Sequence, residues 1–236
     1  MRLASALFYD IKLQFRHGLY FVYLLISHVY LLLLFQIPSS YRETANVLLT
    51  FSDPSMLGFF FIGGLVLLEK GQHIHDPLFV TPYKPEEYLL SKTLSLMLLS
   101  VTSSLYIHIM TFGFERSLFL FTIGVMLTSM IFTLIGLAVA VRCETVNEFF
   151  LQSVIYTTIF CLPLLSYTGI WDSNWMMWLP THASLLLLHS VFEPISISDI
   201  LYCIITLLGW ATFSFWLAQR SFYQSIILKI GRERTW

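Results

Sequence analysis

The chain has 236 residues, of which 57% are hydrophobic and 11% are charged. An ordinary soluble domain contains roughly 25% charged residues, so this composition excludes that class and favours an integral membrane protein. The net charge of -1, without a basic stripe, gives no sign of a nucleic-acid partner.

Residues 2–17 have the pattern of an amphipathic helix that precedes the first long apolar run. Apolar side chains repeat at helical spacing, and Lys12 and Arg16 lie on the opposite side. We expect an interfacial helix on the cytoplasmic surface of the membrane, with its cations near lipid phosphates. A cytoplasmic extension of the first span is the alternative interpretation.

Long apolar runs along the rest of the chain predict an all-α membrane protein with six transmembrane helices, since about 20 apolar residues cross a bilayer. Asp53 and Pro54 are typical of a helix start, a capping carboxylate followed by proline, which makes residues 39–53 an outer loop. The predicted spans are residues 19–37, 54–70, 93–112, 118–141, 149–169 and 200–218, within a single transmembrane domain 1–236.

The later spans carry two irregular features. Pro163 is expected to kink or break the fifth span, because proline removes a backbone N–H donor. Residues 183–192 are apolar but too short to cross, which predicts a short outer re-entrant or interfacial helix before the last span. A tail, residues 219–236, follows that span.

Basic residues predict the orientation. All 13 Lys and Arg residues except Arg42 and Arg116 fall in segments on one side of the predicted spans. Because Lys and Arg gather in cytoplasmic loops, we expect both termini in the cytoplasm and a multi-pass protein in the plasma membrane.

The loop from Glu69 to Lys92 holds most of the charge found in the predicted cytoplasmic loops between spans. Between Gly71 and Pro82 there is room for one short helix across the membrane axis, and Pro85 marks the start of the third helix. His73 and His75 have no further ligand at metal-binding spacing, so we predict no metal site.

Several functional classes lack their motifs. No charged residue lies in the middle of a predicted span, which disfavours an ion-driven carrier. His28 and His108 are the remaining ionisable candidates, and we expect each to hydrogen-bond a neighbouring helix. No G-x-S-x-G, H-E-x-x-H or Walker A motif is present, so we predict no catalytic residue and no enzyme. Energy for uphill movement of a solute must then come from another chain.

Three segments carry a family resemblance. Glu69-Lys70 is followed by LFVTPYKPEEYLLSK at 78–92, which matches an acidic residue, a Leu-x-x-x-Pro element and a Ser-Lys that opens a span. The stretch GLAVAVRCETVNEFFLQSVIYTTIFCLPLLSYTGIW at 136–171 contains a Leu-Pro followed by Ser-x-x-Gly. With the amino-terminal interfacial helix, nearly the whole chain resembles a type-2 ABC transporter permease. The segment DPSMLGFFFIGGLVLLEKGQ and the loop after it are most similar to fluoroquinolone-export permeases.

The resemblance implies partners and sites. Two permease subunits, identical or related, are expected to work with cytoplasmic ABC ATPase subunits that bind ATP and Mg, and this chain needs no cofactor of its own. The implied ATPase-coupling loop comprises Glu69, Lys70, Gly71, His73, Asp76, Leu78, Pro82, Lys84 and Glu86, with a short coupling helix at about 71–80. The second cytoplasmic loop comprises Arg142, Glu144 and Asn147. The implied cargo contacts are Phe59, Phe60, Phe61, Tyr156 and Phe160.

An aromatic, uncharged pathway favours an amphipathic or hydrophobic cargo such as a drug, because it buries no unpaired charge. Two other hypotheses stay open. Export of haem, another cofactor or a lipid by the same architecture is the first, and for haem it requires convergence of histidines, since axial iron ligation uses imidazoles. A membrane scaffold without transport is the second. The histidines concerned are His28, His108, His182 and His189.

Overall fold

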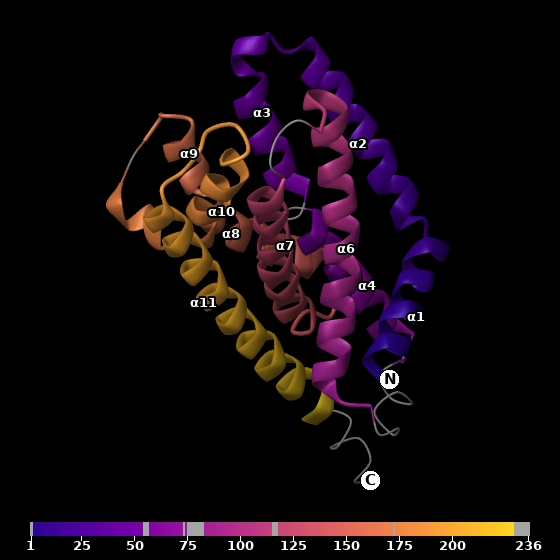
Figure 1. The fold of residues 1–236 in the computed structure, drawn as a ribbon. Helices are drawn as coiled ribbons and strands as arrows, with labels where there is room; N and C mark the ends of the chain where they lie inside the picture. The colour runs from indigo at the N-terminus through magenta and orange to yellow at the C-terminus, as the bar shows by residue number, and fades with distance from the viewer. Residues whose placement is uncertain are drawn as a thin grey trace, which may run out of the picture.

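The computed structural model describes residues 2–53, 57–72, 74, 83–114, 118–171 and 173–228. Within these ranges every regular element is a helix, which confirms the all-α class (Figure 1). Five helical segments among the described residues are long and apolar enough to cross a membrane. They are Leu19–Gln36, Pro85–Phe112, Phe119–Ala140, Val146–Tyr167 and Ile197–Ile227.

The amino-terminal helices form one side of the bundle. Helix α1 (Arg2–Arg16) and helix α2 (Leu19–Gln36) are joined by Gly18, whose φ of 74° lies in the left-handed region that glycine adopts without strain. Both helices pack against α6 (Pro85–Phe112). The predicted helix over residues 2–17 is confirmed as a helix, and its position relative to a membrane stays a prediction.

The segment expected as an outer loop is a helix, so that prediction was wrong. Helix α3 (Ser39–Ser52) buries Val47 and Phe51 and packs mainly against α10 (Pro180–His189). Helix α4 (Gly58–Gly71) follows and packs against α7 (Phe119–Ala140). In Figure 1, α3 lies in the upper half of the bundle and α4 in the lower half. The predicted second span therefore corresponds to a 14-residue helix, too short to be a candidate span by itself.

Helix α7 is the centre of the bundle. It contacts α4, α6, α10 and α11 (Ile197–Phe222). In its most apolar stretch of 18 residues, 78% of the residues are buried. Glycine permits the close crossing of α4, because a Cβ at Gly136 would lie 2.7 Å from the carbonyl oxygen of Phe59. The apolar faces of α4, α6, α10 and α11 thus close around one helix.

The carboxyl-terminal half begins with a broken helix. Helix α8 (Val146–Cys161) stops just before Pro163, and α9 (Pro163–Tyr167) continues after it, which confirms the predicted break. The 3-10 helix η2 (Asn174–Trp178) leads to α10, a helix of 10 residues that packs against α3, α7 and α11. Helix α11 continues into a π-helical turn, η3 (Tyr223–Ile227), so it is longer than the predicted span 200–218.

The two ends of the described chain lie at the same end of the bundle. Figure 1 shows the start of α1, the start of α6 and the end of α11 together at the bottom, which we call the basal end. This arrangement is compatible with both termini on one side of a membrane, and their cytoplasmic orientation stays a prediction.

Candidate functional site

Four buried side chains at the basal end form what we call the basal ion cluster: Asp10, Glu69, Tyr88 and Lys92. The Lys92 ammonium donates to Asp10 Oδ1 at 2.7 Å and to Glu69 Oε1, and the Tyr88 hydroxyl donates to Glu69 Oε2 at 2.6 Å. None of the four is more than 5% exposed. The cluster therefore joins α1, α4 and α6 through charge-assisted hydrogen bonds away from water.

Helical spacing explains how the cluster forms. Tyr88 and Lys92 are four residues apart, so both lie on one face of α6, and Glu69 lies in the last turns of α4. Asp10 and Gln14 are also four apart on α1, and Gln14 Nε2 donates to the Ser95 hydroxyl at 2.6 Å. Burial raises the pKa of the Asp10 carboxyl above its usual value, although the neighbouring Lys92 ammonium lowers it.

Helix α1 turns two of its polar side chains inward, while Lys12 and Arg16 stay exposed. Asp10 and Gln14 are buried against α6, whereas Phe8 and Phe15 are each 71% exposed and Tyr9 is 65% exposed. A helix with polar residues toward protein and aromatic residues outward suits contact with lipid. The buried pairs decide this orientation, because a carboxylate placed toward hydrocarbon would lack its cation.

Further polar contacts tie the remaining helices to the basal end. The Lys70 ammonium donates to the carbonyl oxygen of Cys143 at 2.7 Å and to that of Val141 at 3.3 Å, so it neutralises the carboxyl end of α7. The Arg142 guanidinium donates to the Ser221 hydroxyl at 2.7 Å, which links this end to α11.

Helices α6 and α11 are also bridged. Gln219 Nε2 donates to Glu86 Oε1 at 2.7 Å, and the rings of Tyr88 and Phe222 lie 5.0 Å apart. The start of α6 is therefore connected to α1 and α4 through the basal ion cluster and to α11 through these two contacts.

The residues predicted for the two basal loops have different positions. Glu69 is buried and Lys70 is half-buried, and both are hydrogen-bonded to neighbouring parts of the bundle. Glu144 is exposed between α7 and α8, and Asn147 is exposed in the first turn of α8. Described as well are Gly71 at the end of α4, Lys84 and Glu86 at the start of α6, and Arg142 after α7. His73, Asp76, Leu78 and Pro82, with most of the predicted coupling helix, lie outside the described residues.

The predicted cargo residues do not form one surface. Phe59 is 1% exposed and stacks on Phe149 at 5.8 Å, which makes it a core residue. Phe60 stacks on Phe150 at 5.6 Å beside α8, while Phe61 faces Tyr23 of α2 at 5.4 Å. Tyr156 and Phe160 of α8 are half-buried.

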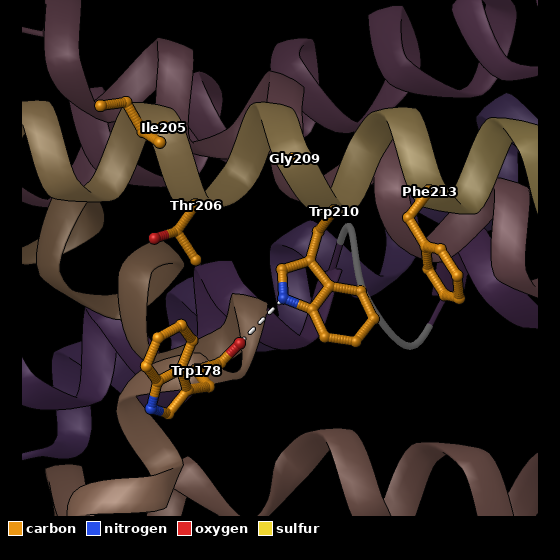
Figure 2. A pocket seen from close by; sticks show the side chains of 6 residues that line it. All are labelled: Trp178, Ile205, Thr206, Gly209, Trp210 and Phe213. Carbon is orange, nitrogen blue, oxygen red and sulfur yellow. Dashed lines mark hydrogen bonds between the residues drawn. The ribbon is translucent and has the colours of Figure 1, made fainter.

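A groove that the sequence interpretation missed lies between η2 and α11. Figure 2 shows Trp210 projecting from α11 toward η2, where its indole N–H donates to the Trp178 carbonyl at 2.8 Å. The groove encloses about 470 Å³ and is largely apolar. Gly209 leaves space beside Trp210, and a Thr-x-x-Gly-Trp spacing on the last span was the available signal. The lining residues are Trp178, Ile205, Thr206, Gly209, Trp210 and Phe213.

The four histidines have separate partners. His28 approaches Tyr106, His108 bonds Asn46, His182 approaches Tyr202, and His189 approaches Tyr167. Among the described residues, no group of three or more His, Cys, Asp and Glu side chains could hold a metal ion. The convergence of histidines that haem export requires is not seen in the described part of the chain.

Comparison with known proteins places this bundle in a family. The model of the Fluoroquinolones export permease protein family matches residues 1–230. Two relatives named as fluoroquinolones export permease proteins, from Mycobacterium tuberculosis strains CDC 1551 and H37Rv, are each 28% identical over 198 residues. The aligned part covers 84% of this chain and 84% of each relative. The match extends from α1 to the end of the described bundle, and the chain therefore belongs to the fluoroquinolones export permease protein family.

Proposed function

We propose that this chain is the membrane subunit of an ATP-driven exporter whose ATPase is a separate cytoplasmic polypeptide. Membership of the export permease family supports a role in transport. The observation that carries the rest of the proposal is the basal ion cluster, which locks α1, α4 and α6 together on either side of the 73–82 segment.

The electrostatics of the basal ion cluster make it suitable for coupling the movements of the helices that it joins. An ion pair away from water is strong only while its geometry is kept, and separating it leaves unpaired buried charges that cost several kcal/mol. An ATPase that bears on the segment between α4 and α6 therefore moves both helices, and α1 with them. Lys70 carries the displacement to α7, and the Glu86–Gln219 contact carries it to α11.

The proposed complex completes the arrangement. In it, α3 and α4 together form the second of six spans, α10 is a re-entrant helix, and a coupling helix lies between α4 and α6. Both termini are cytoplasmic in the plasma membrane, and a second permease packs beside this one. ATP and Mg bind the partner ATPase, and exposed Glu144 and Asn147 add a second contact for it.

The proposed cargo is an amphipathic aromatic molecule such as a fluoroquinolone. The relatives are named for fluoroquinolone export. Phe160 meets Trp210 edge-on at 5.4 Å, so the aromatic side of α8 continues into the groove beside α11. Planar aromatic molecules gain from stacking and edge contacts with such rings.

Co-purification and efflux together test this function. The tagged chain is purified gently from its native membrane, bound proteins are identified by mass spectrometry, and efflux of a fluorescent fluoroquinolone is followed in cells. We expect an ATPase with Walker sequences to co-purify, and we expect Lys92→Ala to lose efflux. Lys12→Ala, an exposed lysine on α1, is the matched control and should keep it.

Two results would contradict the proposal. Repeated preparations without any ATPase would remove the energy source, and efflux that is unchanged in Lys92→Ala at equal membrane abundance would remove the coupling role of the cluster. A scaffold without transport predicts both of these results.

A further inference from the structure

Asp53 is an acidic side chain buried inside the bundle, where the sequence led us to expect an outer helix cap. It follows the last turn of α3, directly before the segment that leads to α4, and is 1% exposed. Its Oδ2 is hydrogen-bonded to the Ser103 hydroxyl, in the middle part of α6. Its Oδ1 has no hydrogen-bond partner among the described residues.

The surroundings of Asp53 are polar but uncharged. Ser27 of α2 lies 3.1 Å from Ser103 through their hydroxyl oxygens, and Tyr23 and Tyr30 of α2 are the titratable side chains that interact electrostatically with Asp53. Within the described part of the chain, no Lys, Arg or His lies at ion-pair distance from Asp53.

Apart from Tyr23 and Tyr30, the ionisable groups of the neighbouring helices have other partners. His28 of α2 approaches Tyr106 of α6, and Tyr88 and Lys92 of α6 belong to the basal ion cluster. Helix α7 carries none, and those of α4 are Glu69 and Lys70 at the basal end. His108 of α6 is bonded to Asn46 of α3 and packs against aromatic rings. The other ionisable side chains of α3 lie in its first half, Tyr41, Arg42 and Glu43, and those of α10 are His182 and His189.

An isolated carboxylate in such a place is unstable. Moving an unpaired charge into an apolar interior costs so much that the group takes up a proton and becomes neutral. We propose that Asp53 is a proton-binding site, a carboxylic acid in this closed arrangement that ionises when the bundle opens.

In this proposal, Asp53 releases its proton when the helix bundle opens. Asp53 ends α3 and is hydrogen-bonded to Ser103 of α6, so separation of α3 from α6 brings water to the carboxyl. A hydrated aspartic acid has a pKa of about 3.9, and at neutral pH it transfers its proton to water and leaves the carboxylate. Closure of the bundle reverses the transfer, so each opening releases one proton and each closure rebinds one. This inference does not require the ATPase partner.

Infrared spectroscopy of the full chain in lipid vesicles at neutral pH tests the site directly. A protonated carboxylic acid has a carbonyl stretching band that a carboxylate lacks. We expect this band in the unchanged protein and its loss in Asp53→Asn. Asp199→Asn is the matched control, since Asp199 is exposed at the start of α11 and should not contribute to the band.

A second variant keeps the test decisive if Asp53→Asn does not fold. Ser103→Ala removes the hydrogen bond to Asp53, so it should shift the frequency of the band and keep its area. Identical acid bands in the unchanged protein and Asp53→Asn, with loss of a carboxylate band instead, would overturn the proposal. An acid band that Ser103→Ala leaves unmoved would overturn it as well.

Discussion

Replacement of Lys92 by methionine is a quantitative test of the basal ion cluster. Lys92 is 3% exposed and pairs with Asp10 and Glu69, so its removal leaves two buried carboxyl groups close together without a cation. Removing one partner of a buried ion pair destabilises a protein by about 3–5 kcal/mol. For a chain of this size, about 2–4 °C of melting temperature corresponds to each kcal/mol, so we expect Lys92→Met to melt roughly 6–20 °C lower.

Thermal unfolding of the purified protein, followed by tryptophan fluorescence, measures this loss. Lys12→Met serves as the control, because Lys12 is exposed on α1 and should change the melting temperature little. The triple variant Asp10→Asn, Glu69→Gln, Lys92→Met removes all three charges and should recover much of the loss, since neutral groups are less costly to bury than unpaired charges. A melting temperature of Lys92→Met within about 2 °C of the unchanged protein would refute the reasoning. A triple variant that melts below Lys92→Met would refute it as well.

Two other predictions concern packing. Gly136→Ala should lose about 1–3 kcal/mol, because its Cβ would lie 2.7 Å from the Phe59 carbonyl oxygen, whereas Gly64→Ala meets no atom within 4 Å and should stay close to the unchanged protein in the same melting assay. Equal melting of the two variants would show that α4 and α7 are not in close contact. Trp210→Phe removes the donor to the Trp178 carbonyl, worth about 1 kcal/mol, and should speed hydrogen–deuterium exchange in η2; unchanged exchange would contradict this.

The start of the second span shows how a correct local signal can mislead. Asp53 followed by proline is a good helix start, and residues 39–53 before it were therefore expected to form an outer loop. In the structure, Val47 and Phe51 bury one face of α3 against its neighbours, chiefly α10. Tertiary packing decides such short amphipathic segments, because local propensity is a weak prior.

The buried position of Asp53 also bears on the mechanism of transport. The sequence interpretation placed no charged residue in the middle of a predicted span, which disfavoured an ion-driven carrier. In the structure, Asp53 is buried beside Ser103, in the middle part of α6. An acidic side chain is therefore present among the helices, and the objection to proton movement from the sequence no longer holds.

Features that depend on neighbouring residues were predictable. The long apolar runs predicted the candidate spans, Pro163 predicted the break after α8, and Pro85 predicted the start of α6. Each follows from a backbone or solvation rule that acts within one segment, such as the missing N–H of proline or the apolar length that a bilayer requires.

Whether a charged side chain is buried or exposed was decided only by the tertiary structure. Lys84 and Lys92 are eight residues apart in the same charged segment, yet Lys84 is exposed and Lys92 is buried. The difference comes from Asp10 and Glu69, which α1 and α4 bring to Lys92 from 82 and 23 residues away. A lysine can be buried only where opposite charges reach it, and which carboxylates do so depends on how the helices pack.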